Sequence, residues 1–154
     1  MSSSPVEVRR VTAGDQQEWT RLFRGYRVFY ELADDADAIE VAWRWVVGEQ
    51  HGLTGLVAHR PGSSGLLGLA NVRSFARPSS ATLGLFLDDL FTDPAERRSG
   101  VGDALLRACG ALAAQRGASV VRWTTSQTNT RARALYDSYA EATRWVTYDM
   151  PPGA

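Results

Sequence analysis

The sequence predicts one domain of the α/β (α+β) class, in which a mixed, mostly antiparallel twisted sheet carries helices on both faces. Its 154 residues, 44% of them hydrophobic and 22% charged, fit a single folded domain of ordinary size. Apolar residues with helical spacing occur near both ends of the chain, and three short apolar runs separated by turns lie between them. These observations predict the order β-α-α-β-β-β-α-β-α-β within residues 6–150, between short tails at 1–5 and 151–154.

One strand and two helices account for the first part of the chain. In residues 6–11, valines alternate with charged side chains, as in a half-buried strand. Thr12 and Asp15 have the spacing of a capping box, which favours a helix start directly afterwards. Aromatic and leucine side chains then recur at helical spacing, and an acidic stretch at 31–37 separates this helix from a second one.

Three strands form the middle of the chain. Residues 53–59, 66–73 and 82–92 are apolar runs of strand length. The turns between them, at 61–65 and 77–80, contain Pro, Gly and Ser and are short enough to join antiparallel neighbours. We therefore expect a three-stranded meander.

The last part of the chain alternates helices and strands. A helix begins at Val101 and ends before Gly117, a residue type that commonly terminates helices. Residues 119–125 predict a strand parallel to its neighbour, because a helix connects it to the meander. Asn129 has the residue type of an N-cap for a further helix, and residues 144–150 predict the final strand.

Composition excludes several classes of function. The 17 basic residues, all of them Arg, balance 17 acidic ones, whereas a nucleic-acid groove needs a basic excess. One cysteine and two separated histidines match no metal-ligand spacing, so we expect no metal and a reducing, cytoplasmic location. The N-terminal residues lack an apolar signal segment and no apolar run has the length of a membrane span, so we expect no membrane association.

The turn that follows the meander is the most informative segment. Gly100 and Gly102 let the backbone turn tightly before the next helix. The N–H groups and the dipole of a helix N-terminus form an anion site, to which Arg97 and Arg98 add positive charge. A nucleotide-binding P-loop is disfavoured because the chain has no Lys, and a dinucleotide fingerprint is disfavoured because Leu105 stands in place of its third glycine.

This turn resembles the signature of the GNAT superfamily of acetyl-CoA-dependent N-acetyltransferases. Residues 97–102 match the family pattern (Gln/Arg)-x-x-Gly-x-(Gly/Ala) at every fixed position. Residues 88–92 look like the family's splayed strand, and residues 129–136 look like its Asn-x-x-Ala-x-x-Leu-Tyr element. The run Leu-Asp-Asp-Leu-Phe is most similar to the small polyamine- and histone-type amine acetyltransferases, with Asp where Glu is usual.

The resemblance implies an acyltransferase that moves an acetyl group from acetyl-CoA directly to a primary amine in a ternary complex. The acceptor would be a small amine, a polyamine or the lysine side chain of a peptide, and a homodimer is consistent with the family. An alternative is an acyl-CoA-binding regulatory module without turnover. The residues that the resemblance assigns to acetyl-CoA are Leu90, Phe91, Thr92, Arg97, Arg98, Ser99, Gly100, Val101, Gly102 and Asn129.

Tyr136 and Asp88 are the catalytic residues that the resemblance implies. Tyr136 would be the general acid, since a phenol stays protonated at neutral pH; a core aromatic is the alternative. Asp88 would be the base, acting through water because it is shorter than the usual Glu. Neighbouring residues of a regular strand face opposite sides, so Asp89 is expected to make a turn or cap hydrogen bond instead. Cys109 lies on an apolar helix face and is expected to be a core residue.

The family's acceptor site lies at the connection between its first two helices. In this chain Tyr26, Tyr30 and Glu31 lie there and are the expected substrate-binding residues. An acidic loop with aromatic neighbours suits a cationic amine through charge attraction and cation–π contact. A solvated loop has the same composition, so both interpretations stay open.

Overall fold

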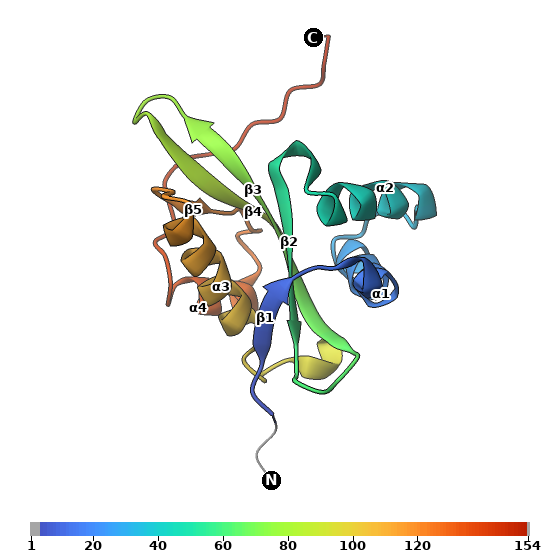
Figure 1. Cartoon of the computed structure of the whole chain (residues 1–154). Helices are drawn as coiled ribbons and strands as arrows, with labels where there is room; N and C mark the ends of the chain where they lie inside the picture. Colours follow the sequence, from blue (N-terminus) through green and yellow to red (C-terminus); the bar gives the residue numbers. More distant parts are fainter. Residues whose placement is uncertain (1–3, 154) are drawn as a thin grey trace. The chain divides into compact units, whose positions relative to one another are not determined.

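A five-stranded sheet forms the centre of the fold in the computed structural model, which describes residues 4–153 (Figure 1). Its strands lie in the order β1-β2-β3-β4-β5, the first four antiparallel and β5 parallel to β4. The bounds are β1 (Glu7–Arg10), β2 (Leu53–His59), β3 (Leu66–Arg77), β4 (Thr82–Thr92) and β5 (Val121–Arg122). The predicted mixed, mostly antiparallel sheet is therefore confirmed.

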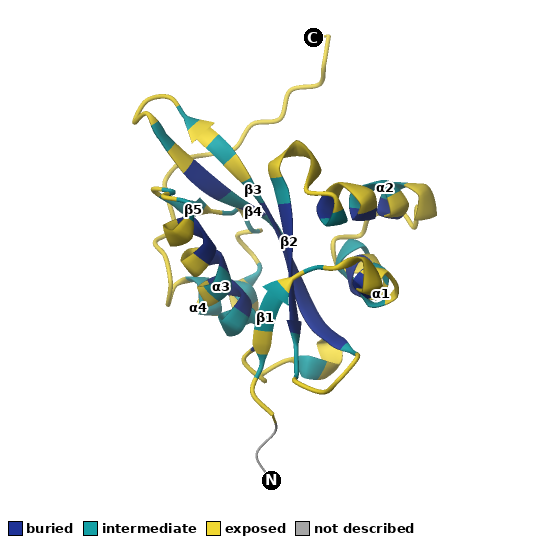
Figure 2. Cartoon of the chain, in the orientation of Figure 1, coloured by how far each residue is buried: buried dark blue, intermediate teal, exposed yellow. Residues whose placement is uncertain are grey.

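Helices cover both faces of the sheet. Helices α1 (Gln16–Phe29) and α2 (Ala36–Val47) pack on one face, and α3 (Val101–Gln115) packs on the other (Figure 1). The dark blue residues in Figure 2 line the helix and strand surfaces that face each other. On the α1 side Trp19 is fully buried and stacks on Phe23, with ring centroids 4.6 Å apart. Aromatic burial of this kind contributes a large share of a core's stability.

On the α3 side the core is aliphatic. Leu105 and Cys109 are fully buried there. Burial disfavours the thiolate and raises the pKa of Cys109 to about 12. The thiol is thus neutral and inaccessible, and the prediction that Cys109 is a core residue is confirmed.

Local hydrogen bonds fix the helix ends. A short 3₁₀ turn ending at Asp15 precedes α1, and the Asp15 carboxylate accepts from the Thr12 N–H (2.8 Å) and from Arg9 (2.7 Å). These partners hold the pKa of Asp15 at about 2. Asp35 caps α2 by accepting from the Ala38 N–H. Gly117 follows α3 with φ +68, the left-handed conformation predicted for its terminating residue.

The chain forms two compact units, Met1–Thr124 and Thr125–Ala154. The sheet and helices α1–α3 belong to the first unit, and α4 (Thr130–Tyr136) belongs to the second. The prediction of a final strand at 144–150 is wrong for this structure, because these residues pair with no described strand. The predicted strand at 119–125 is confirmed only for the two residues of β5. Residues that favour strands form one only where a neighbour takes up their backbone hydrogen bonds.

Candidate functional site

The turn between β4 and α3 exposes a helix N-terminus. Gly100 is the N-cap of α3 and has φ +81, a left-handed conformation that side chains other than glycine rarely adopt. A Cβ at this position would meet nothing within 4 Å, so the constraint is conformational and the space around it is open. The N–H groups of the first turn of α3 have no partner within the helix and are available to an anion.

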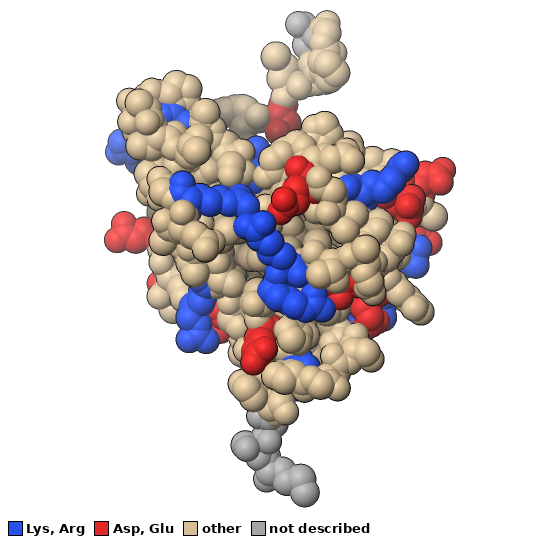
Figure 3. Space-filling view, viewed as in Figure 1, with Lys and Arg blue, Asp and Glu red and all other residues tan. Residues whose placement is uncertain are grey.

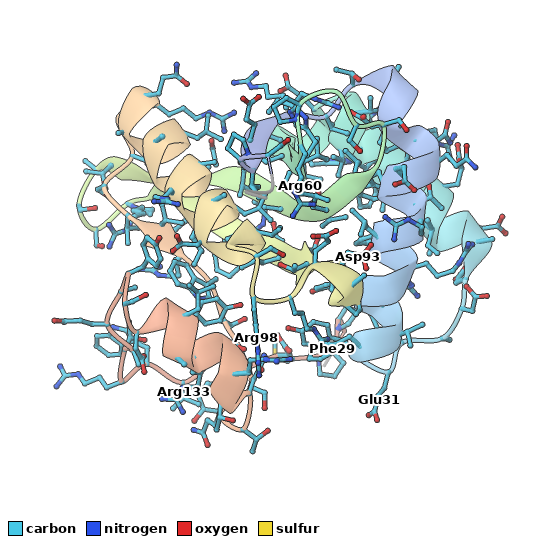
Figure 4. The ribbon with its side chains drawn as sticks, turned by 90° about the horizontal axis from the view of Figure 1, so that it is seen from below. Phe29, Glu31, Arg60, Asp93, Arg98 and Arg133 are labelled. Atoms are coloured by element: carbon cyan, nitrogen blue, oxygen red, sulfur yellow. The ribbon has the colours of Figure 1, made fainter. Side chains whose placement is uncertain are left out.

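Two carboxylates anchor this turn and leave its arginines exposed. Asp93 accepts from Arg21 (2.7 Å) and Glu96 pairs with Arg60 (2.9 Å), so both acids are bound to the preceding elements. Arg97 and Arg98 are exposed, and neither forms an ion pair with another described residue. Figure 4 shows Arg98 extending from the turn. The turn therefore offers two guanidinium groups and a helix N-terminus to an anionic ligand.

Strand β4 has an open edge just before this turn. It pairs with β3 along its length, but with β5 only at Leu85 and Phe86. Between Leu87 and Thr92 no described strand pairs with it on the β5 side. The main-chain groups on such an edge can bind an extended ligand as a strand would. Phe91 itself is buried and its ring packs edge-on against Tyr26, so only its main chain is available for this role.

A β-bulge places two carboxylates at the centre of β4. Asn71 pairs with Asp89 and Val72 pairs with Leu87, which leaves Asp88 as the extra residue. The expectation that side chains alternate regularly between the two faces of the sheet at Asp88 and Asp89 is therefore wrong. Burial raises the pKa of the Tyr26 phenol, and the nearby negative charges of Asp89 and Asp88 add to the rise.

Asp89 is held by two neighbours. It accepts from Asn71 Nδ2 at 2.9 Å and from the Tyr26 hydroxyl. Burial raises the pKa of Asp89 in spite of these two bonds. The expectation that Asp89 makes a turn or cap hydrogen bond is wrong, because it lies within β4 and bonds to two side chains. Asn71 is 2% exposed, and its Oδ1 is a buried acceptor with no partner among the described residues.

Asp88 has a different partner. Arg73 Nε donates to it at 2.9 Å, and the same guanidinium lies 4.7 Å from the centre of the Phe86 ring. Burial raises the pKa of Asp88, Arg73 opposes the rise, and the charge of Asp89 adds to it. A carboxylate with a raised pKa binds a proton more readily than an ordinary aspartate, as a general base must.

Two of the three expected acceptor-site residues lie with these carboxylates. Tyr26 and Tyr30 pack against each other at 4.8 Å between ring centroids. Burial and the charge of Asp89 raise the pKa of Tyr30. Glu31 is exposed with φ +56 and points away from the end of α1, whereas Phe29 leaves the same end in another direction (Figure 4). The structure does not bring Glu31 into the cluster.

Asn129 and Tyr136 belong to the second unit. Asn129 precedes α4 at the N-cap position, but its side-chain amide donates to Thr125 Oγ1 at 3.2 Å. Tyr136 is the last residue of α4 and is half-buried.

Asn71 and Arg73 were missed in the sequence, although they hold the two carboxylates. The available signal was a polar Asn within an otherwise apolar strand. Gly25 was missed as well. A Cβ at this position would lie 2.9 Å from the Phe91 ring, so the glycine lets α1 approach β4 closely.

Charge on the surface is mixed. On the face drawn in Figure 3, a diagonal row of basic side chains is bordered by acidic ones.

Among the described residues no group of three or more His, Cys, Asp and Glu side chains is arranged to hold a metal ion. No helix within residues 4–153 combines the length and apolar character of a membrane span.

Comparisons of the sequence with known proteins give a consistent result. The chain matches the family model described as "Acetyltransferase (GNAT) family" over residues 17–140. YhfO of Bacillus subtilis (strain 168), an uncharacterized N-acetyltransferase, is 30% identical over 145 residues, which are 93% of this chain and 95% of that protein. HPA3 of Saccharomyces cerevisiae, a D-amino-acid N-acetyltransferase, is 22% identical over 96% of this chain and 92% of its own length.

Solved structures share the fold. A probable acetyltransferase superposes with a TM-score of 0.85 at 21% identity and covers 96% of this chain and 99% of its own. The structure of AAC(6')-Iy with a bisubstrate analogue, CoA-S-monomethyl-acetylneamine, has a TM-score of 0.80 at 18% identity, with 96% and 99% of the two chains covered. At these identities the likeness establishes the architecture alone.

Proposed function

The chain belongs to the GNAT acetyltransferase family and is an acetyl-CoA-dependent N-acetyltransferase, and from this premise we propose that it acetylates a cationic primary amine. The observation that carries the proposal is the bulge in β4, which gathers Asp88 and Asp89 beside Tyr26 and Tyr30. Carboxylates attract an ammonium group, and tyrosine rings bind it through cation–π contact. A small amine, a polyamine or a lysine side chain has this chemistry.

The β4–α3 turn fits the acetyl-CoA that the family uses. The N-terminus of α3, Gly100 in its left-handed conformation and the two exposed arginines suit a pyrophosphate. The open edge of β4 from Leu90 to Thr92 supplies main-chain groups for the extended pantetheine arm. Asn129 is the further acetyl-CoA residue that the family resemblance implies. When bound, acetyl-CoA supplies the thioester whose acetyl group is transferred.

In the proposed reaction Asp88 accepts a proton from the amine through one water molecule. The neutral nitrogen forms a bond to the carbonyl carbon, the carbon–sulfur bond breaks, and the Tyr136 hydroxyl donates its proton to the sulfur. The nitrogen then loses its second proton, which passes through water to the Tyr136 phenolate and restores the hydroxyl. Asp89 is held by Asn71 and Tyr26 and orients the ammonium group before it loses its proton. No covalent acetyl-enzyme is needed, in agreement with the buried neutral thiol of Cys109.

The acceptor class draws further support from proteins of similar sequence or fold. HPA3 is named for D-amino acids, and AAC(6')-Iy was solved with an aminoglycoside-derived bisubstrate analogue. Both kinds of acceptor carry a primary amine. Within this class we favour polyamines and lysine side chains, because the Leu-Asp-Asp-Leu-Phe run of β4 is most similar to that subgroup.

The test is thiol release from acetyl-CoA across a panel of polyamines, D- and L-amino acids, aminoglycosides and lysine peptides. We expect release with at least one cationic amine, and a large fall in kcat for Asp88→Asn. Asp89→Asn should chiefly raise the KM for the amine. Saturable CoA binding without release for any amine would favour the alternative of an acyl-CoA-binding regulatory module. Equal kinetic effects of the two variants would contradict the separate roles of the two carboxylates.

A further inference from the structure

The buried amide of Asn71 leaves one hydrogen-bond acceptor unused. Asn71 lies on β3 and is 2% exposed, and its Nδ2 donates to the Asp89 carboxylate at 2.9 Å. An ionised carboxylate only accepts hydrogen bonds, so Asp89 fixes which end of the amide faces it. The Oδ1 at the other end has no donor among the described residues. A buried acceptor without a donor is costly and rare in folded proteins, which points to a donor that is not part of the chain.

Apolar side chains surround Asn71 on the sides away from β4. Its partner on β2 is Gly55, and the space that a side chain would fill there is taken by Val46. Leu69, two residues before Asn71 on the same face of β3, is fully buried. None of these side chains can donate a hydrogen bond. A donor therefore has to approach Oδ1 from the side of β4, where Asp89 and the two tyrosines lie.

We propose that Asn71 Oδ1 accepts a hydrogen bond from the ammonium group of the acceptor, and that Asn71 thereby selects primary over N-methylated amines. This inference rests on the proposed function, in which the ammonium group binds at Asp89. A primary ammonium group has three N–H bonds. One donates to the water beside Asp88, one donates to Asp89, and the third donates to Asn71 Oδ1. The nitrogen is then held at two points when it loses its first proton and attacks.

A methyl group on the nitrogen removes one of these three donors. A secondary ammonium group still supplies Asp89 and the water beside Asp88, but it leaves Asn71 Oδ1 without a partner. A site built to hydrogen-bond a substrate N–H discriminates against an analogue that lacks it, because a buried polar group is then left unpaired. The wild type should therefore prefer the primary amine by about 5- to 150-fold in kcat/KM.

The test compares kcat/KM for two primary amines with that for their N-methylated forms. The pairs are cadaverine with N,N′-dimethylcadaverine, and Nα-acetyl-lysine amide with its Nε-methyl derivative. Asn71→Leu should lower the preference for the primary amine by about 5-fold or more, because the acceptor oxygen is gone. The lost bond to Asp89 affects both members of a pair equally. A purely structural role of Asn71 would therefore lower both kcat/KM values by the same factor and leave the preference unchanged.

Thr54→Val is the matched control. Thr54 is also 2% exposed, but its hydroxyl bonds to Arg116 at the end of α3, at 2.6 Å. This variant should keep the wild-type preference. Asn71→Ala is measured as well, because it removes the amide without adding apolar bulk, and thermal unfolding checks that each variant is folded.

The outcomes separate this inference from the proposed function. A wild type that uses both members of a pair equally well would overturn the role of Asn71 and leave the proposed function intact. An undiminished preference in Asn71→Leu and Asn71→Ala would do the same. No thiol release with either primary amine would instead contradict the acceptor class on which the inference rests.

Discussion

Gly100 gives the sharpest test of the turn that we assign to acetyl-CoA. Its φ of +81 places it in the left-handed region, where the conformational free energy of a residue with a Cβ is less favourable by about 1–2 kcal/mol. No heavy atom lies within 4 Å of the position that a Cβ would take, so a steric clash does not add to this value. If the residue at position 100 leaves the left-handed conformation, the N–H groups at the N-terminus of α3 no longer point at one anion. Since 1.4 kcal/mol is a factor of ten, Gly100→Ala should weaken CoA binding by about 5- to 30-fold. Gly100→Val should weaken it further.

The assay is a calorimetric titration of CoA into each variant, with a thermal unfolding curve as the folding check. Gly110→Ala is the matched control, because Gly110 lies within the same helix, is exposed, and also has nothing within 4 Å of its Cβ position. Its φ is that of an ordinary helix residue, so alanine should stabilise the fold by about 0.5–1 kcal/mol and leave CoA affinity unchanged. A Gly100→Val protein that binds CoA as tightly as the wild type would refute the assignment of this turn.

Three further predictions concern other parts of the molecule. Tyr136→Phe should lower kcat and retain CoA affinity, and unchanged turnover would exclude Tyr136 as the general acid. The pKa of Asp15 is lowered to about 2, so its ionised form contributes about 2 kcal/mol above its unfolded pKa of ~3.9, and this stability is lost as pH falls toward 2. Urea unfolding of Asp15→Asn should show a deficit at pH 6 that shrinks between pH 4 and 2, and a pH-independent deficit would contradict the ion-pair explanation. Gly25→Ala should lower the free energy of unfolding by about 1–3 kcal/mol, because the new methyl would lie 2.9 Å from Phe91, whereas Gly14→Ala meets nothing and should be neutral.

The meander and the α3 region could be predicted because their signals are local. Short turns containing Pro, Gly and Ser bound the apolar runs, and β2 and β4 have the predicted ends. The glycine after α3 stops the helix where the sequence places the stop. The turn that we assign to the pyrophosphate was predictable for the same reason, since its glycines and arginines are contiguous in the chain.

The geometry of the two carboxylates could not be predicted, because it depends on pairing between strands. Regular alternation separates Asp88 from Asp89, and only the register of β3 against β4 reveals the bulge. Asn71 and Arg73 acquire their roles through the same register. The prediction of a final strand was wrong for a related reason, because residues 144–150 have strand propensity but pair with no strand among residues 4–153.

The most direct test of the central claim is to quantify both products of one reaction mixture, free CoA thiol and acetylated amine, by colour reaction and mass spectrometry. The account predicts that the two form in equal amounts, only when a cationic primary amine is added, and that no acetyl group remains on the protein. Thiol release that is independent of amine, or acetyl groups retained on the enzyme, would contradict direct transfer to an amine acceptor.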